Sequence, residues 1–267
     1  MDAQLLLICL LTFVIHLIGT LAYAVRIAGV RTRRIAVSFA LFNILVLVSR
    51  TSNSFQGPFL AKRIEQNIAQ SVSHSMLSDF RWLLFSATLA TVFGAFLIPT
   101  FQRIFSRAVL HFQIHRSLPR LLLHSFFKGG ISQLKNVASI PAVANVKQMS
   151  NSRGISAWVI VLNVAAVALW TIGVFASLYA GYLNPELRVT SSTLSSVVNG
   201  AATIMMFVFI DPHMSVMTDD VVEGRVSEPQ FRKAIVWLVG SRLAGTLLAQ
   251  ALLVPAAIAI VFVAKAM

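Results

Sequence analysis

The chain has 267 residues, of which 57% are hydrophobic and only 12% are charged, and its mean hydropathy is +0.79. A soluble domain carries about 25% charged residues, so this composition excludes an ordinary soluble protein and indicates a membrane protein. The net charge of +13 would suggest nucleic-acid binding in a soluble chain. Here the basic residues cluster between apolar runs, as they do in cytoplasmic loops, so no nucleic-acid partner is expected.

The first apolar run, Leu5–Val25, has two features of a signal peptide but fits a membrane span better. The tripeptide AYA at 22–24 imitates a cleavage site. However, the run is too long for an h-region, and Asp2 stands where a basic n-region is expected. We interpret it as a retained first span, in which the single cysteine, Cys9, packs as a small hydrophobe.

Six segments are long enough to cross the hydrocarbon as helices, which takes about 20 apolar residues. They are 4–25, 35–55, 82–101, 155–180, 192–210 and 234–263. Backbone groups in lipid must be satisfied within the segment, and no barrel-like alternation is present. The expected fold class is therefore all-α: a single polytopic transmembrane domain over 1–267, with amphipathic interfacial helices in the third loop.

The loops predict the orientation. The first loop carries four arginines, and the third loop, 102–154, carries eight basic residues and no acid. Six spans put both loops on the same side, which the positive-inside rule assigns to the cytoplasm. Both termini are then expected outside. The fifth loop, 211–233, is also inside but acidic, which the rule tolerates because acids contribute little to it.

The third loop contains a basic amphipathic segment. Basic side chains recur every four residues beside an apolar face. The basic positions are Arg103, Arg107 and His111, and the apolar ones are Phe101, Phe105, Ala108 and Phe112. Such a helix fits the headgroup layer and favours anionic lipid. The alternative is a helix packed across the cytoplasmic ends of the bundle.

Four spans carry polar side chains at steps of about four residues, which keeps them on one helix face. They are Thr12, His16 and Thr20; Ser49, Asn53 and Gln56; Ser195, Asn199 and Thr203; and Arg242, Thr246 and Gln250. These stripes are predicted to face one another around a hydrated cavity. The alternative is interhelical hydrogen bonding without a ligand, at ~0.6 kcal/mol per bond. His16 is either a packed, hydrogen-bonded residue or a proton relay.

Arg50 and Arg242 point most strongly to a ligand. A guanidinium inside the bilayer costs roughly 3 kcal/mol even on insertion scales, and no acid at comparable depth neutralises both. Two arginines in a polar cavity suit a phosphate or pyrophosphate, which guanidinium groups bind in bidentate fashion. The predicted substrate-binding residues are Arg50, Asn53, Gln56, Asn199, Arg242, Thr246 and Gln250.

Three acids follow the fifth span and could form an inner gate. Asp211, Asp219 and Asp220 are predicted to pair with the arginines of the stretch 26–34, such as Arg26 and Arg31, or with Arg242 in one conformation and to release them in another. The alternative is a helix cap or a solvated loop.

The sequence offers no convincing enzyme motif. His74 and Asp79 match the H-x4-D spacing of some acyltransferases, but this two-residue pattern is best explained by chance. No thiol-metal, zincin, nucleophile-elbow or phosphate-loop motif is present, so no cofactor and no metal are expected. Six spans divide as three plus three, which permits an inverted repeat, but the halves show no convincing self-similarity.

Three blocks resemble the Amj-type lipid II flippases of bacteria, the alternates to the MurJ flippase. They are SRTSNSFQGPF at 49–59, NGAATIMMFVFIDPHMSVMTDD at 199–220 and GSRLAGTLLAQ at 240–250. The resemblance implies a transporter of the bacterial cytoplasmic membrane, not an enzyme. Its implied substrate is the undecaprenyl-pyrophosphate-linked peptidoglycan precursor, moved from the inner to the outer leaflet. The residues alone leave two alternatives: an ion-coupled carrier of another anionic or lipid-linked substrate, and a scaffold without cargo.

Overall fold

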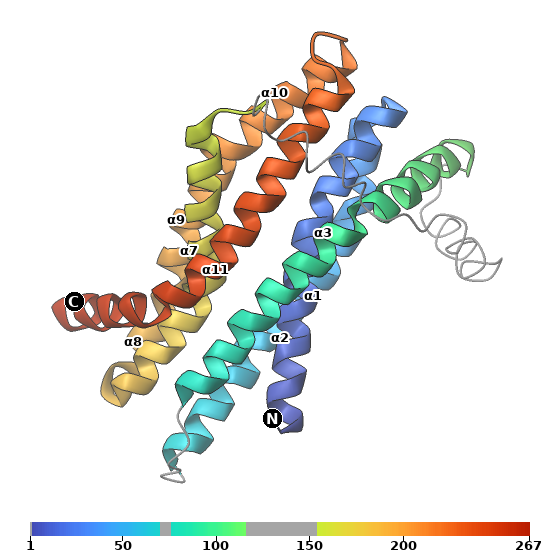
Figure 1. Ribbon diagram of the computed structural model, residues 1–267. Coiled ribbons are helices and arrows are strands. Elements are labelled where there is room, and N and C mark those ends of the chain that lie inside the picture. Colours follow the sequence, from blue (N-terminus) through green and yellow to red (C-terminus); the bar gives the residue numbers. More distant parts are fainter. Residues whose placement is uncertain (1, 70–75, 116–153) are drawn as a thin grey trace.

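The computed structural model describes residues 2–69, 76–115 and 154–267, and these are helical apart from short connections (Figure 1). The first three helices are α1 (Ala3–Thr32), α2 (Ile35–Ala69) and α3 (Met76–His115). They are followed by α7 (Ala157–Leu183), η2 (Pro185–Leu187), α8 (Arg188–Thr193), α9 (Ser195–Ile204), the π-helical η3 (Met205–Ile210), α10 (Asp211–Val222) and α11 (Glu228–Ala266).

Within this part of the chain six helical segments are long and apolar enough to cross a membrane, which confirms the predicted six-span, all-α class. The fifth of them joins η2 through α10 into one stretch, Pro185–Val222. The helices extend beyond the predicted spans: the second continues to Ala69 and the sixth begins at Glu228. Hydropathy marks only the part of a helix that crosses the hydrocarbon, while polar turns at either end stay helical outside it.

Local signals fix several helix ends. Asp2 caps α1, because its side chain accepts a hydrogen bond from the backbone N–H of Leu5. The helix ends at Arg33, whose φ of 53° lies in the left-handed region. Ser227 caps α11 in the same way as Asp2 caps α1, and Gly224, with φ +81°, turns the chain between α10 and α11.

The helices form two groups of three spans. In the first group α1 packs against both α2 and α3, and in the second α7 packs against both α9 and α11. The groups meet mainly where α3 lies beside α11 (Figure 1). We call the end of the bundle that holds Asp2 the outer end and the end that holds Arg31 the inner end, after the predicted orientation.

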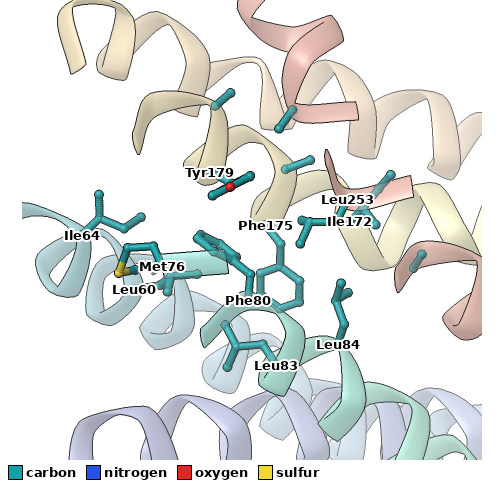
Figure 2. Packing of buried hydrophobic residues seen from close by; sticks show 14 of the residues in the cluster. Leu60, Ile64, Met76, Phe80, Leu83, Leu84, Ile172, Phe175, Tyr179 and Leu253 are labelled. Atoms are coloured by element: carbon teal, nitrogen blue, oxygen red, sulfur yellow. The ribbon is translucent and has the colours of Figure 1, made fainter. Parts of the chain in front are cut away.

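A cluster of apolar side chains joins the two groups at each end. At the outer end Phe80 of α3 packs against Tyr179 of α7, with ring centroids 5.2 Å apart, and Leu253 of α11 closes the cluster (Figure 2). At the inner end Tyr23 of α1 packs with Phe231 of α11. Lipid tails are as apolar as these side chains, so close packing rather than water exclusion holds the clusters together.

Small residues bring α7 and α11 close together. Ser241, Gly245 and Ala249 are all buried on α11. A Cβ atom at Gly245 would lie 2.8 Å from both the Val164 carbonyl oxygen and the Val167 Cβ. The contact with backbone at Gly245 gives the physical reason for the small residues on this face.

The basic stretch after the third span differs from the expected separate helix. It continues α3 without a break as far as His115. Arg103 and Arg107 are exposed there, while Phe105 is buried against Phe42 of α2. Pro99 is the proline closest to this basic stretch, and it lies inside α3 without ending the helix. The helix can therefore continue into the basic residues. The rest of the predicted amphipathic segment, 116–153, lies outside the described residues.

The outer ends of the first three helices are tied by one arginine. Arg63 donates to Asp2 at 2.6 Å and to Asp79 at 2.7 Å, and Asp79 is buried. The Leu5 N–H and then Arg63 lower the pKa of Asp2 below its ordinary value of 3.8. The contact between Asp2 and Arg63 is therefore intact at neutral pH and weakens as the pH falls through the lowered pKa of Asp2. His74, the other half of the H-x4-D pattern, lies outside the described residues.

Replacing Gly245 with Ala should destabilise the protein, because the new methyl meets backbone and a β-branched side chain. Overpacking of this kind costs about 1–3 kcal/mol of the free energy of unfolding. The measurement is the thermal unfolding midpoint in detergent. Gly240→Ala is the matched control, since a Cβ there meets nothing within 4 Å. Equal midpoints for both variants would contradict the packing of α7 on α11.

Replacing Arg63 with Met should lower stability by about 3 kcal/mol, because it removes the guanidinium partner of a buried carboxylate. Lys62→Met serves as control, since Lys62 is exposed on the neighbouring position. The unfolding midpoints of the two variants should differ by several degrees. A midpoint for R63M equal to that of K62M would show that the tie contributes nothing.

Candidate functional site

A layer of polar contacts lies between the outer and inner apolar clusters. Several of its hydrogen bonds join different spans. Gln56 of α2 donates to Thr12 of α1, Gln250 of α11 donates to Thr88 of α3 at 3.0 Å, and Arg242 of α11 donates to Thr20 of α1 at 3.2 Å. The last two connect the first group of helices with the second. The polar layer therefore lies at the interface between the two groups.

Arg242 is the charge at the centre of this layer. Its guanidinium lies directly over Gly19, where a side chain would collide with it. The phenol of Tyr23 is within hydrogen-bonding reach, and His16 is the next polar side chain along the same face of α1. No carboxylate of the described residues forms an ion pair with Arg242. The charge is thus solvated by a hydroxyl and a phenol and not by a carboxylate of the described residues.

Asn163 is a member of this layer that sequence reasoning missed. Its amide nitrogen donates to the Ser241 hydroxyl at 2.7 Å and to the Leu238 carbonyl, and Tyr23 lies beside it. Its side-chain oxygen is buried without a hydrogen-bond partner among the described residues. A lone amide in an apolar span could have signalled this role, because such a group must find partners within the bundle.

Arg50 occupies a different position from Arg242. Ser52 and Gln56 form the buried face of α2, and Arg50 lies on its opposite, exposed face. The Arg50 guanidinium has no hydrogen bond or ion pair with any other described residue. Residues exposed on this same face include Asn43 and Ser54.

The two arginines nevertheless lie at nearly one depth. α2 runs antiparallel to α1, and the Gln56–Thr12 contact sets their register. Arg50 is six residues from Gln56, about 9 Å along the axis, which puts it level with Ile18. Arg242 meets α1 at Gly19 and Thr20. A pocket shared by the two guanidinium groups stays a prediction.

The other residues predicted to bind substrate are spread over the layer and its edges. Thr246 is buried and donates to the Leu243 carbonyl of its own helix. Asn199 lies against Gly173 of α7, and its side-chain oxygen has no hydrogen-bond partner within the described chain. Asn53 is exposed on α2.

Ion pairs connect the two groups of helices at the inner end. Arg26 of α1 contacts Asp211, the first residue of α10, at 2.7 Å, and Arg31 contacts Glu228, the first residue of α11, at 2.9 Å. Glu228 was not among the predicted gate residues. Asp220 pairs locally with Arg225, and Asp219 is exposed.

The segment before Asp211 departs from α-helical geometry. Residues Met205–Ile210 form a π-helix directly before Asp211 and Pro212. Pro212 has no backbone N–H to donate, so the carbonyl one turn earlier loses its α-helical partner. Short π segments in membrane helices often lie at functional sites. Here the segment adjoins the ion pair between the two groups.

Comparison with known proteins identifies the family of this chain. A family model described as Amj, alternate to MurJ, matches residues 11–264. The chain belongs to the Amj family. The predicted family resemblance is thereby confirmed. A relative named Lipid II flippase Amj, from Bacillus subtilis (strain 168), is 37% identical over 98% of this chain and 97% of its own length. No solved structure matches.

In this member of the Amj family the three sequence blocks that carried the resemblance lie close to the polar layer. The first covers the middle of α2 and includes Arg50 and Gln56. The second runs through α9, η3 and α10 and includes Asp211. The third lies on α11 and includes Gln250 and Arg242, which donates to Thr20 of α1.

Reversing one charge of the Arg26–Asp211 pair should impair this Amj protein, and reversing both should restore much of the loss. R26D and D211R each place like charges about 3 Å apart, whereas R26D/D211R recreates the attraction with opposite polarity. The measurement is protein abundance together with cellular function. The exposed pair Arg225–Asp220 provides the control, since its reversal should have little effect. A double variant as impaired as the worse single variant would contradict a direct interaction.

Proposed function

We propose that this Amj protein is a lipid II flippase, a transporter rather than an enzyme. It would move the undecaprenyl-pyrophosphate-linked peptidoglycan precursor from the inner to the outer leaflet. The observation that carries the proposal is the full-length match to a relative bearing that name, at 37% identity. The polar layer between the two helix groups provides a physical basis for it.

The chemistry of lipid II fits the charges of the polar layer. Its pyrophosphate needs cationic partners away from bulk water, and Arg242 lies in the interface without a carboxylate partner among the described residues. A guanidinium binds phosphate oxygens in bidentate fashion, and a low-dielectric surrounding strengthens that bond. Gln56, Thr246 and Gln250 offer hydroxyl and amide groups for sugars and peptide, while the polyprenyl tail stays in lipid.

The exposed face of α2 offers a lateral approach to that layer. Asn43, Arg50, Thr51 and Ser54 recur at helical spacing on one face and are all exposed. Polar groups that face lipid are unfavourable, so such a face needs water or a polar ligand. A headgroup that slides along it would meet Arg50 at the same depth at which Arg242 lies in the interface.

The ion pairs at the inner end would act as the gate. Arg26–Asp211 and Arg31–Glu228 join α1 to α10 and α11, so breaking these pairs would let the two groups separate at the inner end. An anionic headgroup arriving from the cytoplasm would compete with these carboxylates for the arginines. Asp219 lies on the exposed surface of α10 and would join this gate only in another conformation.

The membrane placement follows from the same features. We assign the protein to the bacterial cytoplasmic membrane as a multi-pass protein, with both termini outside. Exposed Arg103 and Arg107 at the inner end of α3 would contact anionic headgroups. His16, beside Arg242, remains the candidate for a proton relay.

Cells that depend on this protein as their sole lipid II flippase should not survive when Arg242 or Arg50 is replaced with Ala. Each change removes a guanidinium for the pyrophosphate, so rescue should fall by at least about tenfold for a loss of roughly 1.4 kcal/mol of binding. Survival after depletion of all other flippases is the measurement, with protein levels determined in parallel.

Arg225→Ala is the matched control, because Arg225 is an exposed arginine of the inner hairpin outside the polar layer. It should rescue like the parent chain. Full rescue by both R50A and R242A would remove the two arginines from the mechanism. Failure of the unaltered chain to rescue, together with uptake of a soluble anion into vesicles, would favour an ion-coupled carrier instead.

A further inference from the structure

The two groups of helices have matching dimensions. The first contains helices of 30, 35 and 40 residues, and the second contains spans of 27, 38 and 39 residues in the same order. In each group the first helix packs against both of the others. Corresponding helices begin 154, 150 and 152 residues apart. The groups enter the membrane in opposite directions, since each has three spans.

Sequence features recur at the same interval. Pro58 and Pro212 are 154 residues apart, and each follows a phenylalanine by three positions. Pro99 and Pro255 are 156 apart, each inside the third helix of its group. Ile18-Gly19 in α1 corresponds to Ile172-Gly173 in α7 at 154 residues.

The third helices share a longer pattern. α3 reads WLLFSATLAT over 82–91 and α11 reads WLVGSRLAGT over 237–246. Tryptophan, leucine, serine and threonine recur at the first, second, fifth and tenth positions. These segments are 155 residues apart, in agreement with the interval found for the other helices.

Hydrogen bonds place the corresponding residues in corresponding contacts. Ser86 of α3 donates to the carbonyl of Cys9 in α1 at 2.7 Å. Ser241 of α11 accepts from Asn163 of α7 at 2.7 Å. Ser86 and Ser241 are 155 residues apart, and Cys9 and Asn163 are 154 apart. The first and third helices of both groups therefore pack in the same register, which helix length alone would not produce.

We propose that the protein is an inverted repeat of two three-helix units, residues 3–115 and 157–266, related by a two-fold axis in the membrane plane. α1 corresponds to α7, α2 to the stretch 185–222, and α3 to α11. A state that opens to the opposite side is then generated when the two units exchange conformations. This inference does not depend on the identity of the substrate.

The contact between α3 and α11 locates the axis. Thr88 contacts Gln250, whose counterpart in the first unit is Ala95. The axis passes midway between such positions, at Thr91 of α3 and at its counterpart Thr246 of α11. Both threonines are fully buried. Transport sites in inverted repeats lie near such an axis, which makes the Thr88–Gln250 contact the centre of the pathway if the proposed function holds.

The two units make different contacts, and these differences describe the conformation that the structure holds. The space over Gly19 holds the side chain of Arg242, which comes from the other unit. The space over the equivalent Gly173 holds the side chain of Asn199, which comes from the same unit as Gly173. Among the described residues, two ion pairs join the units at the inner end, at 2.7 and 2.9 Å. At the outer end the described residues form one ion pair between the units, Arg188–Glu65, at 3.5 Å and at positions not equivalent to those of the inner pairs. The units are alike in fold but not in contacts, as alternating access requires.

Spin-label distances at equivalent positions test the repeat in the full-length protein. In a Cys9→Ser background, one label pair is placed at the inner end on Arg34 and Gln230, and one at the outer end on Ser78 and Val189. All four positions are exposed, and they correspond across the repeat at 155 and 152 residues. Pulsed electron resonance is measured in nanodiscs of phosphatidylethanolamine and phosphatidylglycerol, without substrate.

The inverted repeat predicts that both pairs show the same two distances with opposite populations. The variant D211N/E228Q weakens the inner ion pairs. It should increase the population of the longer distance at the inner label pair and the population of the shorter distance at the outer label pair by the same fraction. A control pair within the first unit, Arg34 and Arg103, should keep one distance. Unrelated distances at the two ends, or a change at one end only, would overturn the proposal.

This experiment separates the repeat from the proposed function. Exchange of distances in a chain that fails to rescue flippase-deficient cells would leave the repeat intact and remove lipid II as the substrate. Rescue by a chain whose label distances do not interchange would support lipid II as the substrate and would overturn the repeat.

Discussion

The central constraint on this protein is a guanidinium held inside a bilayer-spanning bundle without a carboxylate partner in the described chain. Arg242 lies 14 residues after Glu228, which is about 21 Å along the axis of α11 and well inside the span. An arginine at such a depth must be solvated by neighbouring groups. Gly19 leaves room for it, and Thr20 and Tyr23 supply polar atoms. The polar layer between two apolar clusters follows from this requirement.

That layer also explains how the two halves of the bundle are joined. Close packing inside each half rests on small residues and glycines, such as Gly245 against α7 and Gly94 against Thr20. Between the halves, hydrogen bonds from Arg242 and Gln250 and the ion pair of Arg26 contribute alongside the apolar clusters. Polar and ionic contacts between the halves can be replaced by contacts with a ligand or water. The close packing at glycines inside each half cannot be replaced in this way. Movement is therefore expected between the halves and not within them.

The distribution of charge agrees with transport of a lipid that carries a diphosphate. A headgroup of this kind must leave water, cross an apolar layer and return to water, so it needs cations at intermediate depth. Arg50 on the exposed face of α2 and Arg242 in the interface lie at nearly the same level, although they face different surroundings. Under the proposed function, Arg50 would meet a headgroup arriving from the lipid side and Arg242 a headgroup within the interface.

By itself the sequence determined the six spans, the all-α class and the family. These follow from local properties, since apolar length and helical spacing depend only on a segment and its solvent. The tertiary structure decided which side chains meet: the seat of Arg242 on Gly19, Asn163 in the polar layer, Glu228 beside Arg31, and the tie of Arg63 to two carboxylates. It also brought out the repeat, because ten-residue matches with four identities gain meaning only when the same residues make the same contacts. Partner choice depends on the register between helices far apart in the chain, and no local pattern specifies that register.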